Sequence, residues 1–332
     1  MKINSCRLPG LVLTDHEFMI PLDHAQPQGE QITVYAREVV AVGSEEAELP
    51  WLLYLQGGPG FGSPRPGAKS GWLKRAVEEH RVLLLDQRGT GLSTPLSHQT
   101  LALLETPEQQ AEYLKHFRAD SIVRDAESIR AQLLGRDARW SVLGQSFGGF
   151  CVTHYLSAAP GGLHKALITG GLPPLERPAE DVYRATYRRT LEKNRRYYER
   201  YPEDIQQAQE IATYLSEHDV GLPGGGRLTP RRFQQLGLYF GASDGFEQTH
   251  YWLREAFVEG TKGNEIGYKA LRQLENTFMF ETNPIFAVLH EAIYCQKSAS
   301  RWAADRVRSE FSEFQIMPGK PVYFTGEMIY RL

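Results

Sequence analysis

The sequence predicts an α/β fold built on a mostly parallel sheet, and three observations predict it. Short, continuous apolar runs recur through the first half of the chain, and such runs are typical of parallel strands that are covered on both faces. A stretch with helical periodicity lies between two of these runs. Strand signals then stop near residue 176, where a long helix-rich region begins. Alternating strands and helices imply right-handed crossovers within one sheet.

The strands can be placed in chain order. Gln31–Val40 partly alternates apolar and polar residues and is rich in β-branched side chains, so with His16–Asp23 it predicts an antiparallel hairpin. The continuous apolar runs predict parallel strands at Trp51–Leu55, Val82–Leu85, Ser141–Leu143 and Ala166–Thr169.

One crossover helix is predicted over Ser121–Leu134. Its apolar residues Ile122, Ala126, Ile129 and Leu133 fall on one helical face, and the Gly135 that follows is a natural C-cap.

The same patterns divide the chain into three parts. Residues 1–175 are predicted to form the α/β core. Residues 176–314 are rich in Arg, Glu, Tyr and Gln at helical spacing and are predicted to form a helical cap, with a loop at 221–227. Residues 315–332 are expected to return to the core as an incomplete part of it, with Pro321–Thr325 as a strand.

Composition excludes several function classes. The 332 residues carry 37 Lys+Arg against 40 Asp+Glu, which excludes a strongly basic nucleic-acid binder. The basic run Arg184–Arg200 contains Glu192 and Glu199, which favours a solvated helix face.

No apolar run approaches the roughly 20 residues of a membrane helix, and the N-terminus lacks the apolar stretch of a signal peptide. The three cysteines are far apart, so we expect neither a disulfide framework nor a zinc site, and a cytoplasmic location.

The strongest chemical signal is Gly144-Gln145-Ser146-Phe147-Gly148, which fits G-x-S-x-G between a strand and a helix. In this context the pattern predicts a nucleophile elbow, the feature that defines an α/β-hydrolase fold. The flanking glycines are needed because side chains there would collide with neighbouring backbone in the strained turn. We therefore predict that Ser146 is a nucleophile; the alternative is an ordinary glycine-rich turn.

A second glycine-rich loop, Gln56–Gly60, directly follows the strand Trp51–Leu55. This loop could bind phosphate or form a plain turn. A phosphate site is disfavoured because the sequence lacks the Gly and Lys spacing of a P-loop. The loop is better interpreted as part of an oxyanion hole, because glycine lets backbone N–H groups approach a developing oxyanion. We expect the two donors to be Gly58, in preference to Gly57, and Phe147, the residue after the nucleophile.

A third motif, Asp86–Ser93, follows the strand Val82–Leu85 and so lies at the edge of the sheet where the site is expected. An aspartate there could be catalytic. The preferred interpretation is structural, with Asp86 and Arg88 holding a tight turn beside the oxyanion loop.

Three segments occur in a characteristic order and spacing: LQGGPG, DQRGTGLS and GQSFGG. Two more follow, HEAIYCQ at 290–296 and FTGEMIY at 324–330. In these segments the chain resembles the proline iminopeptidase family of α/β-hydrolases. The resemblance covers essentially the whole chain. It implies a serine aminopeptidase that removes N-terminal proline from peptides under a helical cap. Gln56 stands where the family commonly has histidine, a change that leaves the backbone donors intact.

The resemblance also implies that acidic cap residues hold the free α-amino group of the substrate. An ammonium in a partly dry pocket needs a carboxylate partner. Glu291 matches best and Glu327 second; the alternative for each is a surface or packing role. The many cap aromatics could form a box for a proline ring, although most are expected to be packing residues. They include Tyr183, Tyr187, Tyr197, Tyr198, Tyr201, Tyr239, Phe240, Tyr251, Trp252 and Tyr294.

No histidine after Ser146 follows a late core strand, as the triad order would require. We place His154 on the elbow helix, His164 at a strand start, and the other three in the cap: His218, His250 and His290. The family's acid and histidine are expected beyond residue 332, so the chain is expected to be C-terminally truncated relative to the family. Glu327 is a weak candidate for the triad acid because no histidine follows it.

The sequence therefore predicts a serine aminopeptidase that needs no cofactor or metal and that acts on small peptides with a free N-terminus. We expect neither nucleic acid nor membrane as a partner. An esterase or amidase on the same fold and a non-catalytic ligand-binding relative remain alternatives, because fold does not fix substrate.

Overall fold

The computed structural model describes residues 2–261 and 263–330, which form two compact units. Unit 1 comprises the chain through Pro173 together with Phe280–Ile293. Unit 2 comprises Pro174–Met279 and the chain from Tyr294 onward. Each unit contains its own cluster of buried apolar side chains.

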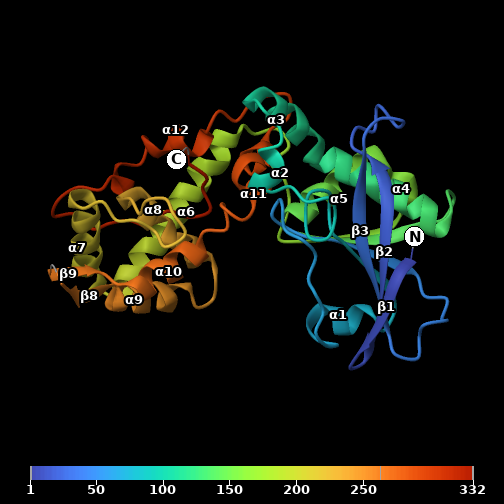
Figure 1. Cartoon of the computed structure of the whole chain (residues 1–332), viewed down its shortest axis with the longest axis horizontal. Coiled ribbons are helices and arrows are strands. Elements are labelled where there is room, and N and C mark those ends of the chain that lie inside the picture. Colours follow the sequence, from blue (N-terminus) through green and yellow to red (C-terminus); the bar gives the residue numbers. More distant parts are fainter. Residues whose placement is uncertain (1, 262, 331–332) are drawn as a thin grey trace. The chain divides into compact units, whose positions relative to one another are not determined.

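Unit 1 is built on a seven-stranded sheet in the order β1-β2-β3-β5-β4-β6-β7. Figure 1 labels its strands β1, β2 and β3. Strands β5, β4, β6 and β7 are mutually parallel, and β1 to β3 extend the sheet antiparallel, with β3 paired to β5. The predicted hairpin and α/β fold are confirmed. The strands are β1 Lys2–Leu8, β2 Leu11–Pro21, β3 Gln31–Ala41, β4 Trp51–Leu55, β5 Arg81–Leu85, β6 Trp140–Gln145 and β7 Leu163–Thr169.

Both faces of the parallel strands are buried, which explains their unbroken apolar sequences. Leu53 and Leu55 of β4 join a core cluster with α4 and α5, whereas Leu52 and Tyr54 join a cluster with α1 on the opposite face. The helix predicted over 121–134 lies within α4, which Gly135 caps. The helices of unit 1 are α1 Gly71–Ala76, α2 His98–Leu101, α3 Pro107–Leu114, α4 Ala119–Leu134, α5 Phe147–Ala158 and α11 Pro284–Leu289.

The segment that contains α11 differs from the expected domain division, because it packs in unit 1 and not with the other cap residues. Ile285 and Leu289 are buried in the main core cluster of unit 1. The Arg118 guanidinium donates to the carbonyl oxygen of Ala292 at 3.0 Å. The chain therefore leaves unit 2 after Met279 and returns to it at Tyr294.

Unit 2 is helical as predicted, with a short hairpin that the sequence patterns did not indicate. Its aromatic residues mostly pack inside: Tyr183, Tyr187 and Tyr197 are buried. No helix of the described chain is both long and apolar enough to cross a membrane. The elements are α6 Ala179–Arg200, α7 Asp204–Glu217, α8 Pro230–Gln234, α9 Gly245–Glu255, β8 Phe257–Gly260, β9 Gly263–Ile266, α10 Tyr268–Thr277 and α12 Ala303–Arg308.

The segment Pro321–Thr325 is not a strand and belongs to unit 2, which differs from the expected return to the core. Its backbone groups are hydrogen-bonded to α6 and α8. The Phe324 N–H donates to Asn194 Oδ1 at 2.7 Å, Asn194 Nδ2 donates back to the Phe324 carbonyl at 2.8 Å, and the Thr325 N–H donates to the Gln234 carbonyl at 2.7 Å. Because Asn194 and Gln234 bind these backbone groups, the segment does not pair with a strand.

Candidate active site

Ser146 occupies a strained turn between β6 and α5. Its φ of 53° and ψ of −119° lie in a region that non-glycine residues rarely adopt. The turn is fixed on both sides, because the Ser146 N–H donates to the Thr169 carbonyl at 2.9 Å and the Ser146 carbonyl accepts from Gly149 at 2.8 Å. Strain of this kind costs about 1–3 kcal/mol and persists where the surrounding structure enforces it.

The glycines on either side of Ser146 are required sterically, as the sequence predicts. A Cβ on Gly144 would overlap the backbone of Gly148, and a Cβ on Gly148 would overlap the carbonyl of Leu55. The helix can therefore begin directly against the end of β4. This close approach leaves the half-buried Ser146 at the edge of the sheet.

The Gln56–Gly60 loop lies beside the elbow. A Cβ on Gly57 would come within 2.9 Å of Ser146 Cβ. Gly58 has a φ of 129° and precedes a cis proline. Within the described chain, no hydrogen bond uses the amide of Gly58, and none uses the amide of Phe147 at the first position of α5. Both N–H groups are thus available to bind an oxyanion.

Asp86 and Arg88 have structural contacts. The buried Asp86 carboxylate accepts from the Ser63 and Leu92 amides at 2.8 Å each and pairs with Arg65, so it ties together two loops at the edge of the sheet. Arg88 is also buried but forms its ion pair with Asp125 of α4. These contacts support the structural interpretation of the motif.

Glu291 lies in unit 1, in the single-turn helix η4 (Glu291–Tyr294) directly after α11, and is 5% exposed. The neighbouring α11 approaches the glycine-rich loop: Phe286 contacts Phe61, the residue that follows the loop, with ring centroids 5.3 Å apart. Glu291 is thus attached to the same unit as Ser146, although the sequence suggested a cap position.

Glu327 lies in unit 2, on an irregular segment between the half-buried Gly326 and the buried Met328. The residue is solvent-exposed, although nearby protein desolvates its carboxyl enough to raise the pKa. Glu291 and Glu327 therefore belong to different units.

No side chain of the described residues is hydrogen-bonded to the Ser146 hydroxyl. His154 lies on α5 and His164 at the start of β7, as expected, and His218 and His250 belong to unit 2. His290 is the exception to the sequence interpretation, because it lies in unit 1, buried edge-on against Phe286 at 4.9 Å between ring centroids.

One group of potential metal ligands was not apparent from sequence spacing. Glu203, Asp204 and His250 of unit 2 place their ligand atoms within 4.8 Å of one another. Asp204 already accepts hydrogen bonds from Tyr197 and from His250 Nδ1, so the two buried members of the group form a hydrogen-bonded pair, while Glu203 is exposed.

Two residues near the site escaped the sequence analysis. Gly171 lies against the Ser146 carbonyl, and its only sequence signal is the Gly-Gly pair after β7. Asn283 caps α11 by accepting from the Phe286 amide at 3.2 Å and lies against Gly60. Among the described residues nothing bonds to its buried Nδ2.

Residues 50–290 match the model of the alpha/beta hydrolase fold family, which is the class that the parallel sheet and the nucleophile elbow indicate. Two curated relatives match 97% of this chain. A proline iminopeptidase of Aeromonas sobria is 53% identical, with 75% of its length covered. The proline iminopeptidase aneH of Aspergillus aculeatus is 38% identical, with 73% covered. The chain belongs to the proline iminopeptidase family.

Solved structures are more distant. An alpha/beta hydrolase from Novosphingobium aromaticivorans is 15% identical, with a TM-score of 0.39 over 98% of this chain and 94% of that one. A 2-hydroxy-6-oxo-6-phenylhexa-2,4-dienoate hydrolase from Rhodococcus sp. strain RHA1 is 16% identical, with a TM-score of 0.35 over 86% of this chain and 76% of that one. At these values the similarity carries no argument about the activity of this chain.

Proposed function

We propose that this chain is a serine aminopeptidase that releases N-terminal proline from peptides through an acyl-enzyme on Ser146. The observation that carries the proposal is the strained Ser146 turn between β6 and α5, with Gly57 directly beside it. Membership of the proline iminopeptidase family supports the choice of substrate.

The chemistry follows from the elbow and its loop. The Ser146 oxygen attacks the carbonyl carbon of the N-terminal proline, and the oxyanion that develops is held by the Gly58 and Phe147 amides. The C–N bond then breaks, the amine of the shortened peptide leaves with a proton, and water releases proline from the serine ester. A general base must take the hydroxyl proton and deliver it to the leaving amine.

Selectivity for a free N-terminus requires a negative partner for the proline ammonium, and we assign this role to Glu291, with Glu327 as a second candidate. The buried position of Glu291 supports its assignment, because a charge-assisted hydrogen bond is stronger when it is shielded from water. Glu291 also lies two residues after α11, whose Phe286 contacts Phe61 at the end of the glycine-rich loop.

We further infer small peptides as the partners and the cytoplasm as the location. The near balance of acidic and basic residues supports the absence of a nucleic-acid partner. Cys6 and Cys151 are free cysteines, as is usual in a reducing compartment.

The test is hydrolysis of a matched set of naphthylamides by the protein and by Ser146→Ala. Cleavage of proline-naphthylamide should be slow, because no side chain of the described residues bonds to the Ser146 hydroxyl. It should still be faster than cleavage of N-acetylproline-naphthylamide, because the acetyl group removes the ammonium but leaves the scissile bond unchanged. Loss of activity in Ser146→Ala would exclude a contaminating peptidase. Equal cleavage of both substrates, or cleavage of p-nitrophenyl acetate alone, would replace the aminopeptidase with an esterase or amidase. Binding without turnover of any substrate would indicate a non-catalytic relative.

A further inference from the structure

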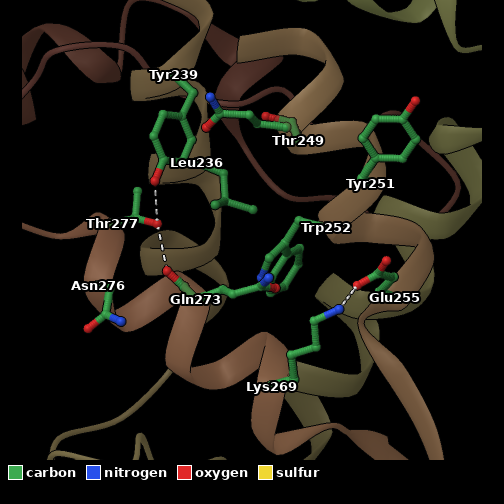
Figure 2. A pocket seen from close by; sticks show the side chains of 11 residues that line it. Leu236, Tyr239, Thr249, Tyr251, Trp252, Glu255, Lys269, Gln273, Asn276 and Thr277 are labelled. Carbon is green, nitrogen blue, oxygen red and sulfur yellow. Dashed lines mark hydrogen bonds and ion pairs between the residues drawn. The ribbon is translucent and has the colours of Figure 1, made fainter. Parts of the chain in front are cut away.

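Unit 2 contains a cavity of about 580 Å³, within the usual range of ligand sites. It lies between α9, α10 and the 3₁₀ helix η3 (Gln235–Gly241), and Figure 2 shows the side chains around it. All of its lining residues belong to unit 2. They are Leu236, Tyr239, Gln248, Thr249, Tyr251, Trp252, Glu255, Lys269, Gln273, Asn276 and Thr277.

Three aromatic rings and Leu236 supply the apolar surface of this cavity. Trp252 is 7% exposed, and its indole N–H donates to the Ala270 carbonyl at 3.0 Å, which fixes the ring. The Tyr239 hydroxyl donates to Thr277 Oγ1 at 2.8 Å (Figure 2). Tyr251 is 61% exposed. Two of the three rings are therefore held in place before any ligand arrives, which lowers the entropic cost of binding.

The polar groups of the cavity are mostly neutral. Gln273 and Asn276 are exposed on α10, and their side-chain amides make no hydrogen bond to the described residues. The two charged lining residues, Glu255 and Lys269, form an ion pair at 2.5 Å. The cavity thus offers aromatic surface, amide donors and little net charge, which favours an uncharged ligand with apolar groups and carbonyl acceptors.

We propose that this cavity binds an extended, proline-rich peptide segment in the polyproline II conformation. Such a segment exposes its carbonyl oxygens without internal hydrogen bonds and is recognised by aromatic-lined grooves, because the preformed helix loses little entropy on binding. Proline rings would pack on Trp252 and Tyr251, and the Gln273 and Asn276 amides would donate to peptide carbonyls. The site needs no free N-terminus, so it goes beyond the proposed aminopeptidase activity and does not depend on it.

The experiment is calorimetric titration of the protein with hexaproline that is acetylated at its N-terminus and amidated at its C-terminus. This probe has no ammonium group for an aminopeptidase to recognise. A blocked Gly-Ser peptide of equal length is the control ligand. Tyr251→Ala and Asn276→Ala remove exposed lining groups, so neither disturbs the core. Tyr268→Ala is the matched control, since Tyr268 is 72% exposed on α10 and does not line the cavity.

We expect hexaproline to bind more tightly than the Gly-Ser peptide. Tyr251→Ala should weaken binding by about 2–12-fold, the range for one aromatic contact, and Tyr268→Ala should leave it unchanged. Absence of hexaproline binding, equal binding of the two peptides, or equal binding by Tyr251→Ala and the parent protein would overturn the proposal. None of these results depends on turnover, so the site and the proposed function can fail separately.

Discussion

The carbonyl oxygen of Ser146 lies in the space that a side chain on Gly171 would occupy. Gly171 follows β7 by two residues, and the last residue of that strand, Thr169, accepts the hydrogen bond of the Ser146 amide. The end of β7 therefore accepts the hydrogen bond of the strained turn's N–H and, at Gly171, leaves the space that the turn's carbonyl needs.

Gly171→Ala should displace the Ser146 turn, because the new methyl group would overlap the Ser146 carbonyl. We expect slower labelling of Ser146 by a fluorophosphonate and a loss of about 1–3 kcal/mol in the free energy of unfolding, as is usual for overpacking. Urea unfolding and labelling rates measure the two effects. Gly161→Ala is the control, since nothing lies within 4 Å of its Cβ position. Equal behaviour of the two variants would show that the turn does not rely on this contact.

The buried pair of Arg88 and Asp125 should contribute strongly to the stability of unit 1. Arg88 Nε and Asp125 Oδ2 are 2.7 Å apart, and Arg88 also donates to the carbonyls of Leu22 and His116. Asp125→Ala would leave the guanidinium buried without its counter-charge, at a cost of about 3–5 kcal/mol. Urea unfolding should show a lower midpoint for this variant. Glu79→Ala, which breaks an exposed pair with Arg75, should not change the midpoint measurably.

His290 should make stability depend on pH. Burial lowers the pKa of His290 to about 4, below its ordinary value of 6.5. Between these values the unfolded chain binds more protons than the folded one, so stability rises with pH through this window and is lost as pH falls. The change is up to about 3 kcal/mol. Urea unfolding from pH 4.5 to 7.5 should show this slope, and His290→Gln should flatten it. An unchanged slope in His290→Gln would assign the effect to other groups.

Glu291→Gln should raise KM for proline-naphthylamide by about 10–150-fold, the value of one charge-assisted hydrogen bond. Glu327→Gln tests the second candidate in the same assay. Hydrolysis of p-nitrophenyl acetate, which has no ammonium, is the control reaction. A parallel loss on both substrates would mean that Glu291 has a structural role.

Local patterns were sufficient for the elbow and for the strands of the sheet other than β1, whose exposed edge position left no apolar pattern to detect. The continuous apolar run at Trp51–Leu55 matches β4 because both faces of this strand are buried. The glycines around Ser146 are needed because side chains there would overlap neighbouring backbone, as the G-x-S-x-G motif predicts. These features depend on residues close in sequence or on burial alone.

Partners distant in sequence could not be predicted in the same way. The helical spacing of residues 176–314 predicts one cap but does not show in which core a helix is buried, and Ile285 and Leu289 are buried in the core of unit 1. Pro321–Thr325 has the composition of a strand, yet Asn194 and Gln234 take its backbone hydrogen bonds. The contact of Gly171 with Ser146 likewise depends on the pairing of β6 with β7.

The central claim is that Ser146 is the nucleophile, and labelling with a fluorophosphonate followed by peptide mass mapping tests it most directly. A fluorophosphonate reports only the nucleophilic attack by the serine oxygen, so the result does not depend on which peptide is the preferred substrate. We predict a single adduct on the peptide that contains Ser146 and no adduct in Ser146→Ala. An adduct on another residue, with Ser146 unmodified, would contradict the account.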